Sequence, residues 1–153
     1  MMHLYDQSSD RINKLITRAY STSFSLGILG LNRSLRDPIY GIYGFVRVAD
    51  EIVDTFHGHD KASLLKRFWK DTHMALDERV STNPVLHSFQ RVVHTYQIDR
   101  SLVDTFLASM EMDLEDRTYT QAEYEKYILG SAEVVGLMCL KVFVGGDQAQ
   151  YEE

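Results

Sequence analysis

The chain has very few cysteines and prolines: one cysteine, Cys139, and two prolines among 153 residues. A single cysteine cannot form a disulfide within the chain, which is typical of proteins in a reducing cytoplasm. Because Cys139 lies in an apolar run, we expect it to be a small, buried hydrophobic side chain. The sequence is therefore not that of a small domain held together by disulfides.

Long hydrophobic segments and a basic amino-terminal leader are also missing. The longest apolar stretch, residues 134–144, is interrupted by Gly136 and Lys141, whereas a helix needs about 20 apolar residues to cross a bilayer. Residues 1–11 contain no basic segment followed by an apolar one, so no signal peptide is predicted. We expect a soluble, cytoplasmic protein, and a peripheral contact with a membrane surface stays open.

Clusters of lysine and arginine are absent, and the formal net charge is −6. Sequence-independent affinity for DNA or RNA depends on clustered basic side chains that neutralise phosphates. We therefore expect no nucleic-acid partner. The composition, with 44% apolar and 25% charged residues, is ordinary for a globular protein, and the chain is long enough for one domain or part of one.

Helical periodicity recurs along the chain, while the alternation typical of strands is missing. Helix starts are marked by cap residues that precede a proline, Asp37-Pro38 and Asn83-Pro84, and by the capping box of Thr120 and Glu123. These signals predict an all-α fold of about six helices. The first begins near residues 8–9 and ends at 20–24, and the others span about 38–56, 61–80, 84–96, 100–110 and 121–145.

The predicted helix at 38–56 is apolar on nearly every side and yet carries four polar residues in one stripe. Tyr43, Arg47, Asp50 and Asp54 follow one another at helical spacing. Isolated charges in a protein interior cost several kcal/mol each, so they must be paired, hydrated or bound to a metal. The sequence therefore marks this stripe as a candidate site.

Two interpretations of the stripe stay open from the residues alone. In the first, Arg47 forms ion pairs with Asp50 or Glu51 on a partly exposed face. In the second, Asp50 and Asp54, one helical turn apart, direct two carboxylates at one Mg²⁺ ion, which prefers oxygen ligands and shares its coordination with phosphates. Arg47 would then contact a diphosphate oxygen through its guanidinium.

The stripe lies within a longer pattern that resembles a known family. Residues 42–54, IYGFVRVADEIVD, resemble the first aspartate-rich motif of squalene and phytoene synthases. Residues 20–24, YSTSF, are similar to the serine-rich element of that family, and residues 110–114, 117–119 and 127–138 resemble its later blocks in the same order. The resemblance extends from about residue 20 to residue 144.

This resemblance implies a fold, an activity and its requirements. The fold would be an all-α, isoprenoid-synthase-type helical bundle, with residues 1–153 as the N-terminal part of a single domain, ending before the second aspartate-rich motif. The activity would be Mg²⁺-dependent head-to-head condensation of two prenyl diphosphates, farnesyl (C15) or geranylgeranyl (C20), through a cyclopropylcarbinyl diphosphate. Mn²⁺ is an alternative metal, and dependence on NADPH is not implied either way.

The resemblance also assigns roles to individual residues. The metal ligands would be Asp50 and Asp54, and the catalytic set would add Arg47 and Tyr43, whose ring would stabilise positive charge. Substrate-binding residues would be Ser21, Ser23, Phe24, Arg47, Val134 and Gly136. Two positions depart from the family pattern, because Glu133 replaces a glycine and Leu129 replaces a frequent aromatic residue.

Other interpretations remain beside this one. Ser21 and Ser23 are good helix caps on composition alone, and Asp113 lies in an acidic run that is typical of a solvated face. A non-catalytic helical bundle that binds metal or a partner would use Asp54 and His57, three residues apart. An isolated fragment of the domain would be inactive and would form homo-oligomers through apolar helix faces.

Overall fold

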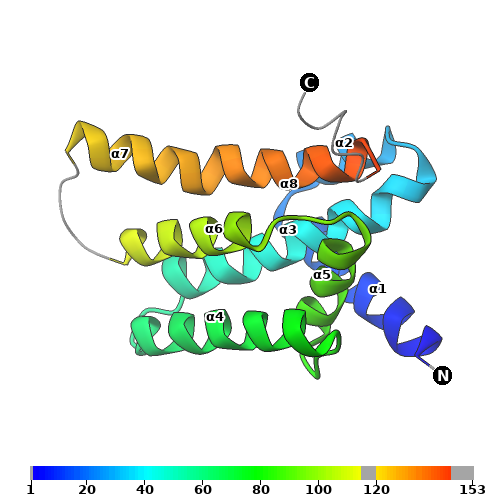
Figure 1. Ribbon diagram of the computed structural model, residues 1–153, viewed down its shortest axis with the longest axis horizontal. Coiled ribbons are helices and arrows are strands. Elements are labelled where there is room, and N and C mark those ends of the chain that lie inside the picture. Colours follow the sequence, from blue (N-terminus) through cyan, green and yellow to red (C-terminus); the bar gives the residue numbers. More distant parts are fainter. Residues whose placement is uncertain (1, 115–119, 146–153) are drawn as a thin grey trace.

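Helix α3 (Arg33–Asp54) lies at the centre of a computed structural model that describes residues 2–114 and 120–145 (Figure 1). It packs against helices on several sides. Its neighbours are α1 (His3–Tyr20), α2 (Thr22–Leu29), α4 (Lys61–Glu78), α5 (Pro84–Thr95), α6 (Arg100–Asp113) and α8 (Val134–Phe143). The described residues contain no strand, which confirms the predicted all-α class.

The last described helical segments form one rod that lies along α6 (Figure 1). The rod consists of α7 (Gln121–Ile128), the π-helical turn η1 (Leu129–Glu133) and α8. It begins at the predicted capping box, in which Thr120 and Glu123 satisfy each other's backbone N–H groups. Its last turn is followed by Gly145 with a φ of +66°, close to the predicted stop; Gly146 lies outside the described residues.

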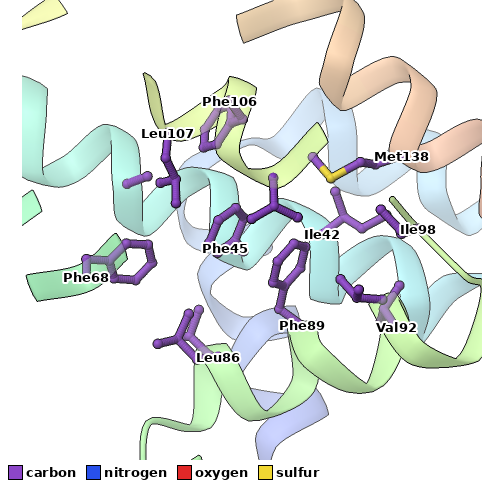
Figure 2. Packing of buried hydrophobic residues seen from close by; sticks show 14 of the residues in the cluster. Ile42, Phe45, Phe68, Leu86, Phe89, Val92, Ile98, Phe106, Leu107 and Met138 are labelled. Carbon is purple, nitrogen blue, oxygen red and sulfur yellow. The ribbon is translucent and has the colours of Figure 1, made fainter. Parts of the chain in front are cut away.

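The core is an aromatic and aliphatic cluster around Phe45 of α3 (Figure 2). Phe45 is fully buried, and its ring stacks on Phe89 of α5 with a centroid distance of 3.9 Å. Phe68 of α4 and Phe106 of α6 approach the same ring at 5.5 and 5.7 Å. The side of α3 that carries Phe45 thus packs in the core, and the polar stripe lies on a different side of the helix.

Most predicted helix starts are confirmed. Asp60, Asn83 and Asp99 each accept a hydrogen bond from a backbone N–H in the first turn of the helix that follows. Pro84 is the first residue of α5, where its missing N–H breaks no helical bond. Among the described residues, no helix is both long enough and apolar enough to cross a membrane.

Two predicted boundaries near the amino terminus are wrong, the predicted end of the first helix is confirmed at Tyr20, and α2 was not predicted. The first helix begins at His3 rather than near residue 8, and α3 is capped by Asn32 rather than by Asp37. Pro38 therefore lies inside α3, one turn after its start, where it removes a single backbone bond. The serine-rich segment is only a one-residue break, because Ser21 ends α1 and caps α2.

Helix α1 buries polar rather than apolar residues against α3. Its buried side chains are Ser9, Asn13 and Thr17, whereas Leu15 is 68% exposed. Asn13 donates to the carbonyl oxygen of Val85 at 3.4 Å, and the Thr17 hydroxyl donates to the carbonyl oxygen of Asn13 at 2.8 Å. These bonds satisfy part of the buried polar surface between α1, α3 and α5, whereas Ser9 Oγ and Asn13 Oδ1 have no hydrogen-bond partner among the described residues.

Candidate functional site

Arg47 is at the centre of the polar stripe on α3 and contacts three carboxylates of the same helix. Its Nη2 lies 2.6 Å from Glu51 Oε1 and 3.9 Å from Asp54 Oδ2, and its Nη1 lies 3.8 Å from Asp50 Oδ2. The strong bond is thus to Glu51, and the contacts with the two aspartates are loose. The ion-pair interpretation is correct for Glu51, while both aspartates keep oxygen atoms available for another cation.

Tyr20, the last residue of α1, covers the Arg47 guanidinium. The guanidinium carbon lies 4.8 Å from the centroid of the Tyr20 ring, a cation–π distance. Hydrogen bonding to Glu51 raises the pKa of the Tyr20 hydroxyl above its ordinary value. Burial acts to raise the pKa of Glu51, but bonds from Arg47, Tyr20 and Thr55 outweigh it and leave the pKa lowered, so Glu51 is a stable anion.

The serine-rich segment lies beside the stripe. The ring of Phe24 stacks on the ring of Tyr43 with centroids 4.7 Å apart. Ser21 accepts a hydrogen bond from the N–H of Phe24 at 3.1 Å and so acts as the cap that its composition indicated. Ser23 is exposed on the first turn of α2. The segment is therefore held next to α3 by a cap and an aromatic stack.

The two aspartates of the stripe differ in their surroundings. The Asp50 side chain is 31% exposed and that of Asp54 is 55% exposed. Burial raises the pKa of Asp50 to about 6, and the negative charges of Asp54, Asp113 and Glu51 contribute in the same direction, although Arg47 opposes them. Asp50 is thus a carboxylate whose ionised form is disfavoured, chiefly by burial.

Helices α6 and α7 add a third carboxylate and a tyrosine to this region. Burial and the charge of Asp54 raise the pKa of Asp113. The Tyr127 hydroxyl lies 3.4 Å from Asp113 Oδ2, and burial together with the charges of Asp113 and Asp50 raises the pKa of Tyr127 to about 12. Asp113 therefore belongs to the electrostatic surroundings of the stripe, rather than only to a solvated acidic run.

The described residues of the stripe do not form an all-protein metal cage. Within residues 2–114 and 120–145, no set of three or more His, Cys, Asp or Glu side chains is placed to hold a metal. Mg²⁺, however, is commonly held by one or two carboxylates, with waters and substrate phosphates as the remaining ligands. Asp50 and Asp54 are the two side chains of the stripe that could hold such an ion.

His57 does not join the aspartates in the described part of the chain. Its Nδ1 lies 3.1 Å from the Lys61 ammonium, which also donates to the carbonyl oxygen of Val53 at 2.6 Å. His57 thus takes part in the end of α3 and the start of α4. This placement gives the Asp54 and His57 pair no support as a metal site.

An apolar pocket of about 390 Å³ lies between α2, the start of α3 and the end of α8. Phe24 lines this pocket and also stacks on Tyr43, so it connects the pocket to the stripe. Burial raises the pKa of the Cys139 thiol in the pocket wall to about 11, so this thiol stays protonated. The wall consists of Ser23, Phe24, Gly27, Ile28, Leu31, Ile39, Cys139 and Phe143.

Val134 and Gly136 occupy different surroundings from this pocket. Val134 is 3% exposed and belongs to the core, whereas a Cβ atom at Gly136 would meet no atom within 4 Å. Gly130 of the π-helical turn packs closely on α6, where an added Cβ would lie 2.9 Å from the carbonyl oxygen of Thr105. The predicted contacts of Val134 and Gly136 with a substrate stay predictions.

Several residues of the site were not predicted from the sequence. Tyr20 covers Arg47, Tyr127 contacts Asp113, and Cys139 lines the pocket. Glu51, four residues after Arg47, was already among the ion-pair partners that helical spacing indicated. No signal in the sequence places Tyr20 over Arg47, because that contact crosses between two helices.

Comparison with known proteins relates the chain to one family. A family model described as squalene/phytoene synthase matches residues 17–153. A phytoene synthase of Rhodobacter capsulatus is 29% identical over 137 residues, which are 88% of this chain and 40% of the relative. A presqualene diphosphate synthase of Sinorhizobium fredii is 32% identical over 127 residues, which are 82% of this chain and 45% of that protein.

A solved structure confirms the predicted fold. The crystal structure of the squalene synthase HpnC from Alicyclobacillus acidocaldarius superposes with a TM-score of 0.84 at 23% identity. The match covers 97% of this chain and 56% of that protein. The chain thus has the all-α isoprenoid synthase fold and spans about half the length of the proteins that it matches.

Proposed function

Because this chain belongs to the squalene/phytoene synthase family, we propose that it provides the first diphosphate site of an enzyme that joins two prenyl diphosphates head to head. The substrates would be farnesyl or geranylgeranyl diphosphate. The reaction would pass through a cyclopropylcarbinyl diphosphate, which ionises again and rearranges to a C30 or C40 hydrocarbon in squalene or carotenoid biosynthesis.

One observation carries this proposal: Phe24 lines an apolar pocket and stacks on Tyr43, one turn before Arg47 on α3. A prenyl diphosphate has a charged head and a long apolar tail, so its site needs charged and apolar walls side by side. The stripe offers a guanidinium and carboxylates that would hold a metal ion, and the pocket offers apolar walls. The two surfaces are continuous through Phe24.

Each residue of the stripe has a task in this reaction. Asp50 and Asp54 would hold Mg²⁺, with Mn²⁺ as an alternative, and the bound ion would supply positive charge that stabilises the departing diphosphate. Arg47 would bind a diphosphate oxygen through a guanidinium N–H. The exposed Ser23 hydroxyl, on the first turn of α2, would donate to another oxygen.

The aromatic pair would act on the carbocation that diphosphate departure leaves behind. The faces of aromatic rings attract cations, so Tyr43 and Phe24 would stabilise positive charge close to the stripe. The apolar pocket would exclude water, which otherwise quenches such a cation. Val134 and Gly136 would contact the prenyl tail from α8.

We further propose that residues 1–153 are the N-terminal part of one catalytic domain and have no turnover alone. The matched region is 40% and 45% of the length of two relatives, so more than half of each relative lies outside it. The single cysteine supports a cytoplasmic location. Exposed apolar residues on α2 and α8, Leu26, Leu29, Leu140 and Phe143, support homo-oligomer formation by the isolated chain or peripheral contact with a membrane.

Product analysis tests the proposed activity. The full gene product is incubated with Mg²⁺ and either C15 or C20 diphosphate, with and without NADPH, and the hydrocarbon products are identified. We expect a head-to-head product with one of the substrates, and loss of that product in Asp50→Ala and Asp54→Ala. Unchanged turnover in both variants would remove the basis for the assignment.

A further inference from the structure

The Arg47 guanidinium is held on two sides by groups that the proposed reaction does not use. The Glu51 carboxylate lies 2.6 Å from Nη2 and the Tyr20 ring lies 4.8 Å from the guanidinium carbon. The Nε atom is buried and makes no hydrogen bond among the described residues. Arg47 thus has one strong partner in the plane of its guanidinium and one on the face.

The contacts of Arg47 with Glu51 and Tyr20 are important because Arg47 could also pair with other carboxylates nearby. Asp50 and Asp54 lie 3.8 and 3.9 Å from its Nη atoms, so a small rotation of the side chain would bring it into a tight pair with either aspartate. Such a pair would neutralise a carboxylate that the proposed function assigns to Mg²⁺. The bond to Glu51 and the cover by Tyr20 oppose this rotation.

Tyr20 is suited to this task by its position. It ends α1, and the next residue, Ser21, is extended and caps α2, so the Tyr20 backbone is fixed from both directions. Its side chain is on the surface, with the residue 51% exposed. Removal of the Tyr20 ring would therefore leave no cavity in the core, and the main consequence would fall on Arg47.

We propose that Tyr20 is a positioning residue that holds the Arg47 guanidinium on Glu51, so that Arg47 faces an incoming diphosphate while Asp50 and Asp54 stay available for the metal. The proposal rests on the function proposed above, since it assumes a diphosphate and a divalent ion as ligands. The Tyr20 ring provides the cation–π contact, and its hydroxyl secures Glu51.

Two variants separate the contributions of the ring and the hydroxyl. Tyr20→Leu removes both, and Tyr20→Phe removes the hydroxyl alone. Tyr5→Phe is the matched control, because the Tyr5 hydroxyl of the same helix donates to the carbonyl oxygen of Ser81 at 2.6 Å, between α1 and the segment before α5. Circular dichroism establishes that each variant keeps its helices.

The test measures binding of inorganic diphosphate with Mg²⁺ by calorimetry, and hydrogen exchange of the Arg47 Nε–H by NMR. We expect about five- to tenfold weaker binding in Tyr20→Leu, a smaller loss in Tyr20→Phe and no change in Tyr5→Phe. The Arg47 Nε–H should exchange faster in Tyr20→Leu than in the wild type. In Tyr5→Phe, which changes α1 at a site away from Arg47, its exchange rate should not change.

The outcomes distinguish this proposal from the proposed function. Absence of Mg²⁺-dependent diphosphate binding in the wild-type chain contradicts the proposed function and removes the ligand that this proposal needs. Wild-type binding that is unchanged in Tyr20→Leu overturns the role of Tyr20 and leaves the proposed function standing. If Tyr20→Leu does not fold, Tyr20→Met, which also removes the ring and the hydroxyl, replaces it: unchanged diphosphate affinity together with unchanged Nε–H exchange overturns the role.

Discussion

The ring of Phe24 lies 4.7 Å from the ring of Tyr43, and the two planes are inclined by 23°. The first ring belongs to the serine-rich helix α2 and the second to the polar stripe of α3. This stack is thus the point where two motifs, separated by 18 positions in the sequence, become one surface. The predictions below concern that surface and the packing that supports it.

Loss of the aromatic stack should weaken the attachment of α2. Aromatic pairs contribute about 0.5–1.5 kcal/mol beyond the area that they bury. Phe24→Leu should therefore lower the free energy of unfolding, measured by urea denaturation, by about 1 kcal/mol. Tyr43→Phe keeps the ring and should have a smaller effect. A double-mutant cycle of Phe24→Leu with Tyr43→Leu that shows no coupling would argue against a stabilising stack.

Gly44 allows α1 to approach α3, and alanine at this position should be destabilising. An added Cβ would overlap the side chain of the buried Asn13. Overpacking of this kind costs about 1–3 kcal/mol, so Gly44→Ala should lower the free energy of unfolding by that amount. The effect should shrink when Asn13→Ala is combined with it.

Gly136→Ala is the matched control for that experiment. A Cβ atom at Gly136 would meet no atom within 4 Å, and alanine is favoured over glycine in a helix by about 1 kcal/mol. The substitution should leave the protein as stable as the wild type or more stable. Equal destabilisation by both glycine substitutions would show that the contact between α1 and α3 is not the cause.

The raised pKa of Asp50 predicts a pH-dependent stability in the absence of metal. Burial first, and then the neighbouring negative charges, raise this pKa from 3.8 to about 6. The native state therefore holds the Asp50 proton more tightly than the unfolded state, so the contribution of Asp50 to the free energy of unfolding decreases as the pH rises through that interval. Asp50→Asn should reduce the slope, measured by urea denaturation across this pH range. A slope that is identical in the variant contradicts the assignment.

The same titration should govern metal binding, with the opposite dependence. A proton and Mg²⁺ compete for the Asp50 carboxylate. The affinity for Mg²⁺ with diphosphate should therefore fall as the pH drops below about 6. Calorimetry about one pH unit above and below this value measures the change. An affinity that stays constant would indicate that Asp50 is not a ligand.

Exposed apolar residues on α2 and α8 predict association of the isolated 153-residue chain. Leu26 is 63% exposed on α2 and Phe143 is 48% exposed on α8. Light scattering should show oligomers, and Leu26→Ser with Phe143→Ser should reduce them. Leu4→Ser, at the start of α1, removes an equally apolar exposed side chain and should not. A monomer at all concentrations would contradict this prediction.

The helices could be predicted wherever local signals agree with tertiary packing. Asn83 before Pro84 and Thr120 before Glu123 are signals of this kind, because a cap and the dihedral preference of proline act within one turn. Asp37 before Pro38 was misleading, since packing of α3 across the centre of the bundle outweighs the single hydrogen bond that Pro38 removes.

The site could be predicted only along single helices. The spacing of Arg47, Asp50 and Asp54 places them on one stripe of α3 whatever surrounds that helix. The contact of Tyr20 with Arg47 and the influence of Asp113 on Asp50 arise between helices. Contacts of this kind depend on how two helices pack against each other. The sequence pattern of a single helix does not predict them.

Calorimetric titration of the chain with inorganic diphosphate, with and without Mg²⁺, tests the central claim most directly. If Asp50 and Asp54 hold a divalent ion that binds a diphosphate, binding will require Mg²⁺ and will weaken by at least about tenfold in Asp50→Asn combined with Asp54→Asn. Diphosphate binding that needs no metal, or that is unaffected by this pair of substitutions, would contradict the account.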